Sequence, residues 1–208
     1  MQCENCGKEK KEIPIISTRG MEICQMCDDC NKAEMDQLLS RNKMAVLEIM
    51  RKGGVPKRFL CCRLSEADFK FRDSDQVANG NKGLFFIGDT GTGKTTRLAG
   101  WAAYMVQRGK SIKFIDFSDF ICELRADFKR FNDLKNDMMG VDCLFIDNFD
   151  ANNQYMYDFI FNLVNSLYQR EKQVFYTGAS LPGQEPLAMR IGKTTIQLEL
   201  VKGGLHGN

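Results

Sequence analysis

Short apolar runs alternate along the chain with longer segments in which apolar residues recur at helical spacing. The runs read KGLFFI (82–87), SIKFID (111–116), VDCLFID (141–147) and QVFYT (173–177), with a further candidate, TTIQLEL, at 194–200. Between the runs, the helical spacing is clearest over 98–105, 120–131 and 155–168. Strands that alternate with helices are typical of a parallel sheet with helices on both faces, so we expect a three-layer α/β fold.

A further helix is predicted over residues 31–52, ahead of these runs. Its apolar positions recur at helical spacing, with charged residues between them, and are Met35, Leu38, Leu39, Val46, Ile49 and Met50. Gly53 and Gly54 are expected to end it. Its apolar face can pack on its own domain or bind a partner, and the pattern does not distinguish the two.

Residues 1–30 carry a cysteine pattern that is typical of a zinc site. One Cys-x-x-Cys pair stands at the start, and ICQMCDDC brings three more cysteines about seventeen residues later. The segments EIPIIS and GMEIC read as a hairpin that would bring a second pair round to complete a tetrahedron of thiolates. The predicted Zn²⁺ ligands are Cys3, Cys6, Cys24 and Cys27.

Cys24 is preferred because it directly ends the second strand, whereas Cys27 with Cys30 is the rival second pair. Free cysteines without metal are the remaining alternative. A module of this size cannot build a hydrophobic core, so the metal would serve as its core. Such a module is better suited to docking than to catalysis.

Composition narrows the class of protein without pointing to a partner. The chain has 208 residues, of which 43% are apolar and 27% charged, as in soluble globular proteins. Its net charge of +2 excludes a protein that coats DNA by bulk electrostatics, so any contact with DNA should be local. No apolar run is long enough to span a membrane, and the N-terminus lacks the apolar run of a secretory signal. Without an export signal, the nine cysteines are expected to stay reduced or to bind metal, so we expect a cytoplasmic protein.

The segment GDTGTGKTT follows the run at 82–87 directly and precedes a helix, which is the context that a phosphate-binding P-loop requires. The candidate nucleotide-binding residues are Gly88, Asp89, Thr90, Gly91, Thr92, Gly93, Lys94, Thr95 and Thr96. The glycines let backbone N–H groups close around phosphate oxygens, and the helix N-terminus adds its dipole. We expect Lys94 to reach the β- and γ-phosphates of ATP and the Thr95 hydroxyl to bind Mg²⁺.

A carboxylate for the same metal ion is expected at the end of a neighbouring strand. Asp147 stands at the C-terminal end of the run at 141–147, where a Walker B aspartate holds Mg²⁺. Asp116 ends the run at 111–116 in the same way. Because that run comes directly after the P-loop helix, we interpret Asp116 as a helix cap or a surface residue.

Three stretches together resemble the ATPase domain of DnaC-type bacterial helicase loaders, a group of AAA+ P-loop ATPases with IstB-like relatives. These stretches are GVPKRFLCCRLSEADF, then KGLFFIGDTGTGKTTRLAGWAAYMVQRGKSIKFIDFSDFICELR, then DCLFIDNFD. The resemblance covers roughly residues 54–200 and includes the order and the spacing of the motifs. It implies an AAA+ fold, ATP with Mg²⁺, and assistance of a hexameric replicative DNA helicase onto single-stranded DNA.

The resemblance also implies a division of the chain and a mode of assembly. Some loaders carry an N-terminal zinc-binding module that contacts the helicase. By analogy, the chain divides into a zinc-binding module at 1–30, a linker helix at 31–53 and an AAA+ domain at 54–208. Members of this group also associate with themselves in a nucleotide-dependent way.

Three departures from the family pattern all concern hydrolysis. Asn148 stands where the family has a second acid after the Walker B aspartate, and an amide cannot take up a proton as a carboxylate would. Thr177-Gly178-Ala179 replaces a Thr-Ser-Asn sequence that carries a sensor amide, for which Thr177 or Ser180 is the available substitute. The arginine-finger position falls on Leu198, so Arg190 is the remaining candidate. We therefore expect the chain to bind ATP and to hydrolyse it slowly, and its standing as an enzyme stays open.

A basic segment, SDFICELRADFKRFNDLK, is a candidate contact for single-stranded DNA. As one helix, it would direct Leu124, Phe128 and Phe131 towards a core. The candidate DNA-binding residues are Arg125, Lys129 and Arg130. Basic side chains about four apart on a helix can follow a phosphate backbone. The alternative is a solvated helix face on which Glu123 and Asp127 balance the charge.

Two other functions compete with helicase loading. One is a transposase-helper ATPase of the IstB type, although such proteins usually begin with a helical region and not with a cysteine module. The other is a protein that binds ATP without hydrolysing it and sequesters a host helicase. The partner protein and the rate of ATP turnover would distinguish the three.

Overall fold

The computed structural model describes residues 14–17, 20–23, 42–150, 156–183, 185–201 and 204–206. The chain forms two compact units, Met1–Ala45 and Val46–Asn208. In the first unit, β1 (Pro14–Ser17) pairs antiparallel with β2 (Gly20–Ile23), as the sequence predicts. The predicted zinc ligands all lie outside the described residues: Cys3, Cys6, Cys24, Cys27 and the rival Cys30.

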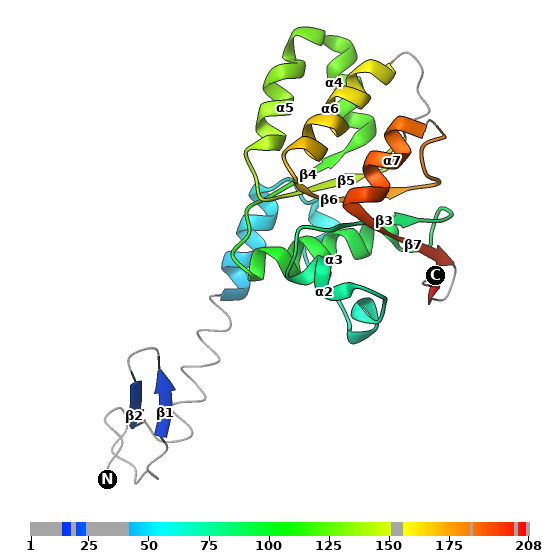
Figure 1. Cartoon of the computed structure of the whole chain (residues 1–208). Helices are drawn as coiled ribbons and strands as arrows, with labels where there is room; N and C mark the ends of the chain where they lie inside the picture. Colours follow the sequence, from blue (N-terminus) through cyan, green and yellow to red (C-terminus); the bar gives the residue numbers. More distant parts are fainter. Residues whose placement is uncertain are drawn as a thin grey trace. The chain divides into compact units, whose positions relative to one another are not determined.

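The second unit is built on a six-stranded sheet in the order β4-β5-β6-β3-β7-β8 (Figure 1). The strands are β3 (Gly83–Ile87), β4 (Ile112–Asp116), β5 (Cys143–Asp147), β6 (Gln173–Gly178), β7 (Thr195–Val201) and β8 (Gly204–His206). β8 is antiparallel to β7, and the other five strands are parallel to one another. The predicted strands of the parallel sheet are confirmed. β5 and β6 are buried along their whole length because helices cover both of their faces.

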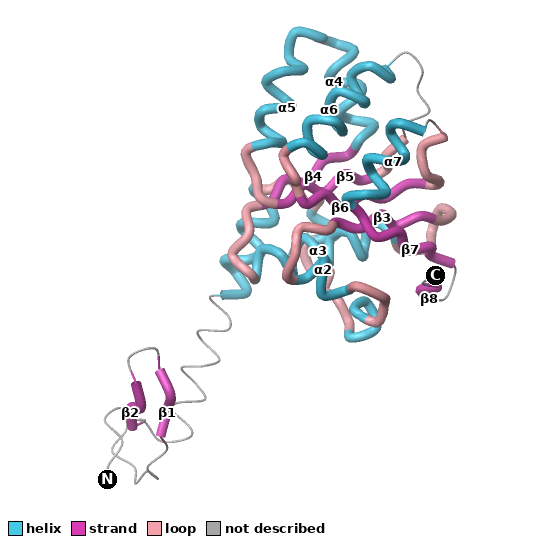
Figure 2. The backbone as a smooth tube through the Cα atoms, viewed as in Figure 1, coloured by secondary structure: helices cyan, strands magenta, loops and turns pink. Residues whose placement is uncertain are grey.

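Helices form a layer on each face of this sheet (Figure 2). One layer contains residues 46–52, which are the part of the helix 42–52 that belongs to this unit, with α2 (Ser74–Ala78) and α3 (Lys94–Gln107). The other layer contains α4 (Phe117–Ala126), α5 (Phe131–Met139), α6 (Tyr157–Gln169) and α7 (Glu185–Thr194). Each layer buries its own apolar core against the sheet. The predicted three-layer α/β fold is thus confirmed.

The helix predicted over 120–131 is wrong in its extent. α4 ends at Ala126, and Asp127 takes an extended conformation, with φ −152° and ψ 96°. A short 3₁₀ turn, η3 (Phe128–Arg130), then leads into α5. The Asp127 carboxylate accepts a hydrogen bond from the backbone N–H of Lys129, so this residue caps a new turn and interrupts the helix.

Three described helices, α2, α5 and α7, have no counterpart in the sequence-based prediction. α7 packs against α6 and leads directly into β7. Among the described residues, no helix is long and apolar enough to cross a membrane.

Candidate nucleotide-binding site

The glycine-rich loop lies between the C-terminal end of β3 and the first turn of α3. Gly88, Gly91 and Gly93 have φ values of 150°, 85° and 86°, a region that glycine adopts without strain. At Gly88 a Cβ atom would lie only 2.3 Å from the carbonyl oxygen of Leu200. Glycine is therefore required there both for the bend and for the close approach of β7.

Lys94 is the first residue of α3, and its ammonium group turns back over the loop. Its Nζ atom donates hydrogen bonds to the carbonyl oxygens of Gly88 at 2.6 Å and of Asp89 at 2.7 Å. The side chain thus spans the space that the loop encloses. This is the position from which a lysine can contact the phosphates of a bound nucleotide.

Asp147 joins the loop to the neighbouring strands. Its Oδ1 atom accepts a hydrogen bond from the hydroxyl of Thr95 at 3.0 Å and another from the hydroxyl of Thr177 on β6. Burial raises the pKa of Asp147, and the negative charge of Asp116 adds to this rise, whereas the two hydroxyl groups oppose it. The predicted pair of Mg²⁺ ligands, Thr95 and Asp147, is therefore brought together by the fold.

Asn148 follows Asp147 and has a left-handed backbone, with φ 57°, which asparagine tolerates better than most residues. Its backbone N–H donates to the Thr177 hydroxyl at 2.9 Å, and its side-chain Nδ2 donates to Oδ2 of Asp116 at 2.7 Å. The other oxygen of Asp116 accepts from the backbone N–H groups of Ser118 at 2.8 Å and Asp119 at 3.4 Å. The interpretation of Asp116 as a helix cap is confirmed, and its bond to Asn148 was not foreseen.

A cavity of about 420 Å³ opens beside these groups. The P-loop forms one wall with Thr90 and Lys94, and the ends of β5 and β6 form the other with Asn148 and Ser180. The Thr177 hydroxyl is already bonded to Asp147 and Asn148. Ser180 is therefore the better placed of the two proposed substitutes for the sensor residue.

Arg97 is a residue of this region that sequence reasoning missed. Its Nε atom donates to Oδ1 of Asp68 at 3.0 Å, and its Nη1 atom lies 3.5 Å from the carbonyl oxygen of Thr92 in the P-loop. Burial alone would raise the pKa of Asp68, but hydrogen bonds from Ser65 and Arg97 outweigh it, and the pKa lies below its ordinary value. The pair fastens the 3₁₀ turn η2 (Glu66–Phe69) to α3 beside the loop. No motif marks it, because the two residues are far apart in sequence.

Arg190, the predicted substitute for an arginine finger, is not brought to the P-loop of its own chain. Its Nε atom donates to Oδ1 of Asn165 at 2.8 Å, and its guanidinium carbon lies 4.7 Å from the ring centre of Phe161, both on α6. Leu198, at the aligned finger position, is buried in the core. A finger role for Arg190 would have to act on a second copy of the chain.

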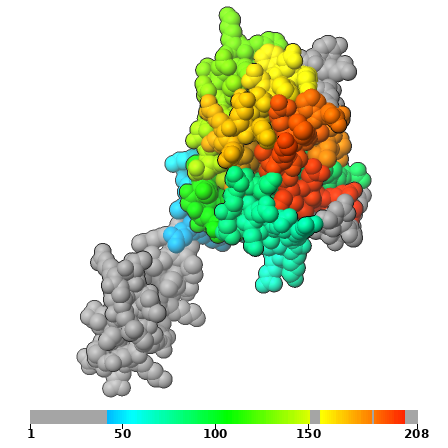
Figure 3. Space-filling view, viewed as in Figure 1, coloured from blue at the N-terminus to red at the C-terminus, as the bar shows by residue number. Residues whose placement is uncertain are grey.

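The predicted DNA-binding residues do not share one helix face, because α4 ends before two of them. Arg125 lies on α4, whereas Lys129 and Arg130 lie in η3, and Arg130 forms an ion pair with Glu123. In the space-filling view the segment between α4 and α5 projects from one end of the unit (Figure 3).

Phe128, in the same segment, was predicted to face the core, but 51% of its surface is exposed. The chain turns at Asp127, so the helical register that would bury Phe128 is lost. Its ring stacks on Phe159 of α6, with 5.2 Å between ring centres. An exposed aromatic ring therefore stands among the basic residues.

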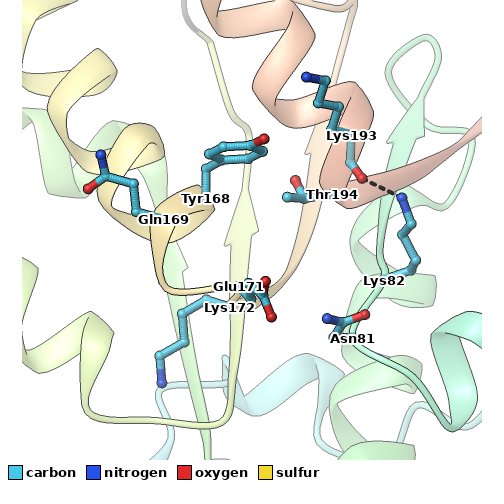
Figure 4. Close-up of a pocket in the computed structure, with 8 residues that line it drawn as sticks. All are labelled: Asn81, Lys82, Tyr168, Gln169, Glu171, Lys172, Lys193 and Thr194. Atoms are coloured by element: carbon cyan, nitrogen blue, oxygen red, sulfur yellow. Dashed lines mark hydrogen bonds between the residues drawn. The ribbon is translucent and has the colours of Figure 1, made fainter.

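A second cavity, of about 410 Å³, lies between the C-terminal ends of α6 and α7 (Figure 4). It opens at the N-terminal ends of β3 and β6, whereas the P-loop follows the C-terminal end of β3. Lys82 donates to the carbonyl oxygen of Lys193 at the end of α7, and Lys172 donates to that of Val141. The cavity therefore lies at the opposite edge of the sheet from the P-loop and is not part of the nucleotide site, and its lysines satisfy backbone carbonyls.

Comparison with known proteins gives one match at the level of a family. The model of the bacterial DnaA ATPase domain matches residues 68–192. No curated protein matches the sequence.

Several solved structures share the fold. A DnaC helicase loader is 20% identical, with a TM-score of 0.54, over 70% of this chain and 100% of that one. A primosome component from Streptococcus pyogenes serotype M3 is 20% identical, with a TM-score of 0.56, over 73% and 92%. The replication initiator DnaA bound to AMPPCP and single-stranded DNA is 20% identical, with a TM-score of 0.54, over 71% of this chain but only 51% of its own. The match thus spans about half the length of DnaA.

Proposed function

The chain belongs to the family of the bacterial DnaA ATPase domain, and from this premise we propose that it is an ATP-binding replication protein that helps a replicative helicase onto single-stranded DNA. The contact of Thr95 with Asp147 beside the P-loop carries the nucleotide part of this proposal. The helicase part is supported by how much of each similar structure the match covers. The match covers nearly all of the loader and primosome structures, but only about half of DnaA.

The residues of the site fit ATP with Mg²⁺. The backbone of the P-loop and Lys94 would hold the phosphates, and the cavity of about 420 Å³ adjoins them. The Thr95 hydroxyl and the Asp147 carboxylate lie 3.0 Å apart and offer the oxygen donors that Mg²⁺ prefers. When bound, Mg²⁺ would neutralise charge on the β- and γ-phosphate oxygens.

We infer slow turnover from the groups that surround the cavity. Asn148 can orient a water molecule but cannot take its proton. The Thr177 hydroxyl and the Arg190 guanidinium are both engaged with other residues of the chain. Loss of an arginine finger alone can slow hydrolysis by about 10³-fold or more. Bound ATP would then act mainly as a signal for assembly and release.

The direct test of the helicase role is capture of the ring-shaped helicase from a bacterial lysate by the full chain, with and without ATP. We expect the helicase to be the main protein retained, and the purified pair to load onto a single-stranded circle. Capture of a transposase in its place would favour the IstB-type alternative. If the helicase is captured but its unwinding is inhibited and ATP is not turned over, the result would favour sequestration of the helicase. Sequestration is the second candidate because Asn148 replaces the second acid.

The proposed zinc module gives a sharper prediction for the same assay. We expect the purified chain to contain one Zn²⁺ by elemental analysis, and Cys24→Ser to lose both the zinc and the captured helicase, because the metal is the core of the module. Cys30→Ser is the matched control and should keep both. The reverse result for these two variants would make Cys30 the ligand in place of Cys24. If the purified, unmodified chain contains no zinc, the proposal of a zinc-binding module would be wrong.

For single-stranded DNA, we propose that Phe128 stacks on a base while Arg125 and Lys129 contact phosphates. Phe128→Ala should weaken binding of a labelled oligothymidine about tenfold or more, since base stacking contributes roughly 1–3 kcal/mol. Met189→Ala on α7 is the control, because Met189 is similarly exposed, at 54%. Equal affinities of the two variants, measured by fluorescence anisotropy, would leave this segment as a solvated surface.

A further inference from the structure

We propose that Asp116 is a positioning residue that fixes the side chain of Asn148, so that the Asn148 amide oxygen orients the attacking water in ATP hydrolysis. This inference rests on the proposed function as an ATPase and deepens it. The acid that the family pattern places after Asp147 is missing, but a second acid stands one strand away and is hydrogen bonded to its replacement.

The first support is the register of the sheet. β4 and β5 are parallel neighbours, and Asp116 lies directly opposite Asp147. The residue after Asp147 therefore emerges beside the Asp116 carboxylate, and Nδ2 of Asn148 lies 2.7 Å from its Oδ2 atom. The contact follows from the pairing of two strands, so it is built into the fold.

The second support is that both partners are held in place. One oxygen of Asp116 caps α4 through the backbone N–H groups of Ser118 and Asp119, so the carboxylate cannot rotate freely. The backbone N–H of Asn148 is bound by the Thr177 hydroxyl at 2.9 Å. Asn148 is thus held at its backbone by Thr177 and at its side-chain amide by Asp116, and it lies on the wall of the cavity next to the P-loop.

The third support is the chemistry of the pair. An ionised carboxylate only accepts hydrogen bonds, so Asp116 selects the NH₂ end of the amide. The amide oxygen of Asn148 then faces away from Asp116, and an oxygen is the end that can accept a hydrogen bond from water. Without Asp116, the amide could turn over and present its NH₂ group, which would orient the water wrongly.

In the hydrolysis itself, the water oxygen forms a bond to the γ-phosphorus while the bond to the bridging oxygen breaks and ADP leaves. The proton of the water passes to the released phosphate or to solvent, because neither end of the amide accepts it. Orientation without proton transfer is consistent with turnover that is slow but still depends on Asp116.

The test compares Asp116→Asn, the exchange variant Asp116→Asn with Asn148→Asp, and Asp119→Asn as a control that removes a carboxylate from the same first turn. Each full-length protein is measured for single-turnover ATP hydrolysis, for affinity for a non-hydrolysable ATP analogue, and for affinity for ADP with aluminium fluoride. The last complex mimics the phosphoryl group with its attacking water. Thermal unfolding by circular dichroism checks that the variants fold.

We expect Asp116→Asn to lower turnover and affinity for ADP–aluminium fluoride about tenfold, with binding of the ATP analogue nearly unchanged. The exchange variant should recover turnover to at least the parent rate, because it keeps the amide–carboxylate bond and places the acid beside the cavity. Asparagine caps helices as well as aspartate does, so a purely structural Asp116 predicts no effect of the single variant.

Unchanged turnover in Asp116→Asn, or no recovery in the exchange variant, would overturn the inference. A parent protein that binds ATP and never hydrolyses it would overturn it as well, while leaving the helicase role in place. Failure of the parent to bind the ATP analogue would instead refute the proposed function.

Discussion

Replacing Lys94 with alanine is expected to lower the affinity of the protein for ATP by about a hundredfold or more. Lys94 is the one P-loop side chain whose charge would meet the β- and γ-phosphates, and charge-assisted hydrogen bonds contribute roughly 1.5–3 kcal/mol each. In the structure its ammonium group already bridges the carbonyl oxygens of Gly88 and Asp89, so its loss also loosens the loop. Fluorescence titration with a labelled ATP measures the change.

The matched control for this variant is Lys110→Ala. Lys110 is exposed in the turn after α3, at the opposite end of that helix from the P-loop. We expect its removal to leave the affinity for ATP within about twofold, because charges separated by more than the Debye length of roughly 8–10 Å are screened. Equal affinity of Lys94→Ala and the parent would mean that the nucleotide binds elsewhere, and the whole proposal for this site would fail.

The parts of the fold that depend on local pattern could be predicted from the sequence. The parallel strands of the sheet appeared as apolar runs, because strands covered on both faces need apolar residues almost throughout. The P-loop was recognisable because its glycines, Lys94 and Thr95 serve a single local geometry. Asp116 was interpreted as a helix cap or a surface residue, and the structure shows it as the cap of α4, a role that is local in sequence.

The parts that depend on tertiary contacts could not be predicted in this way. The periodicity of Leu124, Phe128 and Phe131 suits one helix, yet Asp127 binds its own backbone and begins a new turn, which exposes Phe128. The bond between Asn148 and Asp116 requires the register of β4 against β5, which no local pattern reveals. The same holds for the ion pair of Arg97 with Asp68.

Trp101 provides the prediction with the largest effect on stability. It is fully buried on α3, where its indole stacks at 5.9 Å on Phe175 of β6 and contacts Phe69 at 5.2 Å. Trp101→Ala should lower the free energy of unfolding by about 3–5 kcal/mol, the usual cost of removing a large aromatic side chain from a core. Because Trp101 is the only tryptophan, urea unfolding should be followed by circular dichroism.

Ile49→Ala is the control for this variant, because 44% of Ile49 is exposed, and we expect a change within about 0.5 kcal/mol. The effect of Trp101→Ala should also reach the nucleotide site. Phe69 is the last residue of the turn η2, and Arg97 connects this turn to the P-loop because it binds both Asp68 and the carbonyl oxygen of Thr92. Loosening the ring cluster of Phe69, Trp101 and Phe175 therefore removes one support of the loop. ATP should therefore raise the melting temperature of the variant by less than that of the parent. If the variant is less stable but ATP raises its melting temperature as much as that of the parent, the ring cluster supports only the fold and not the loop.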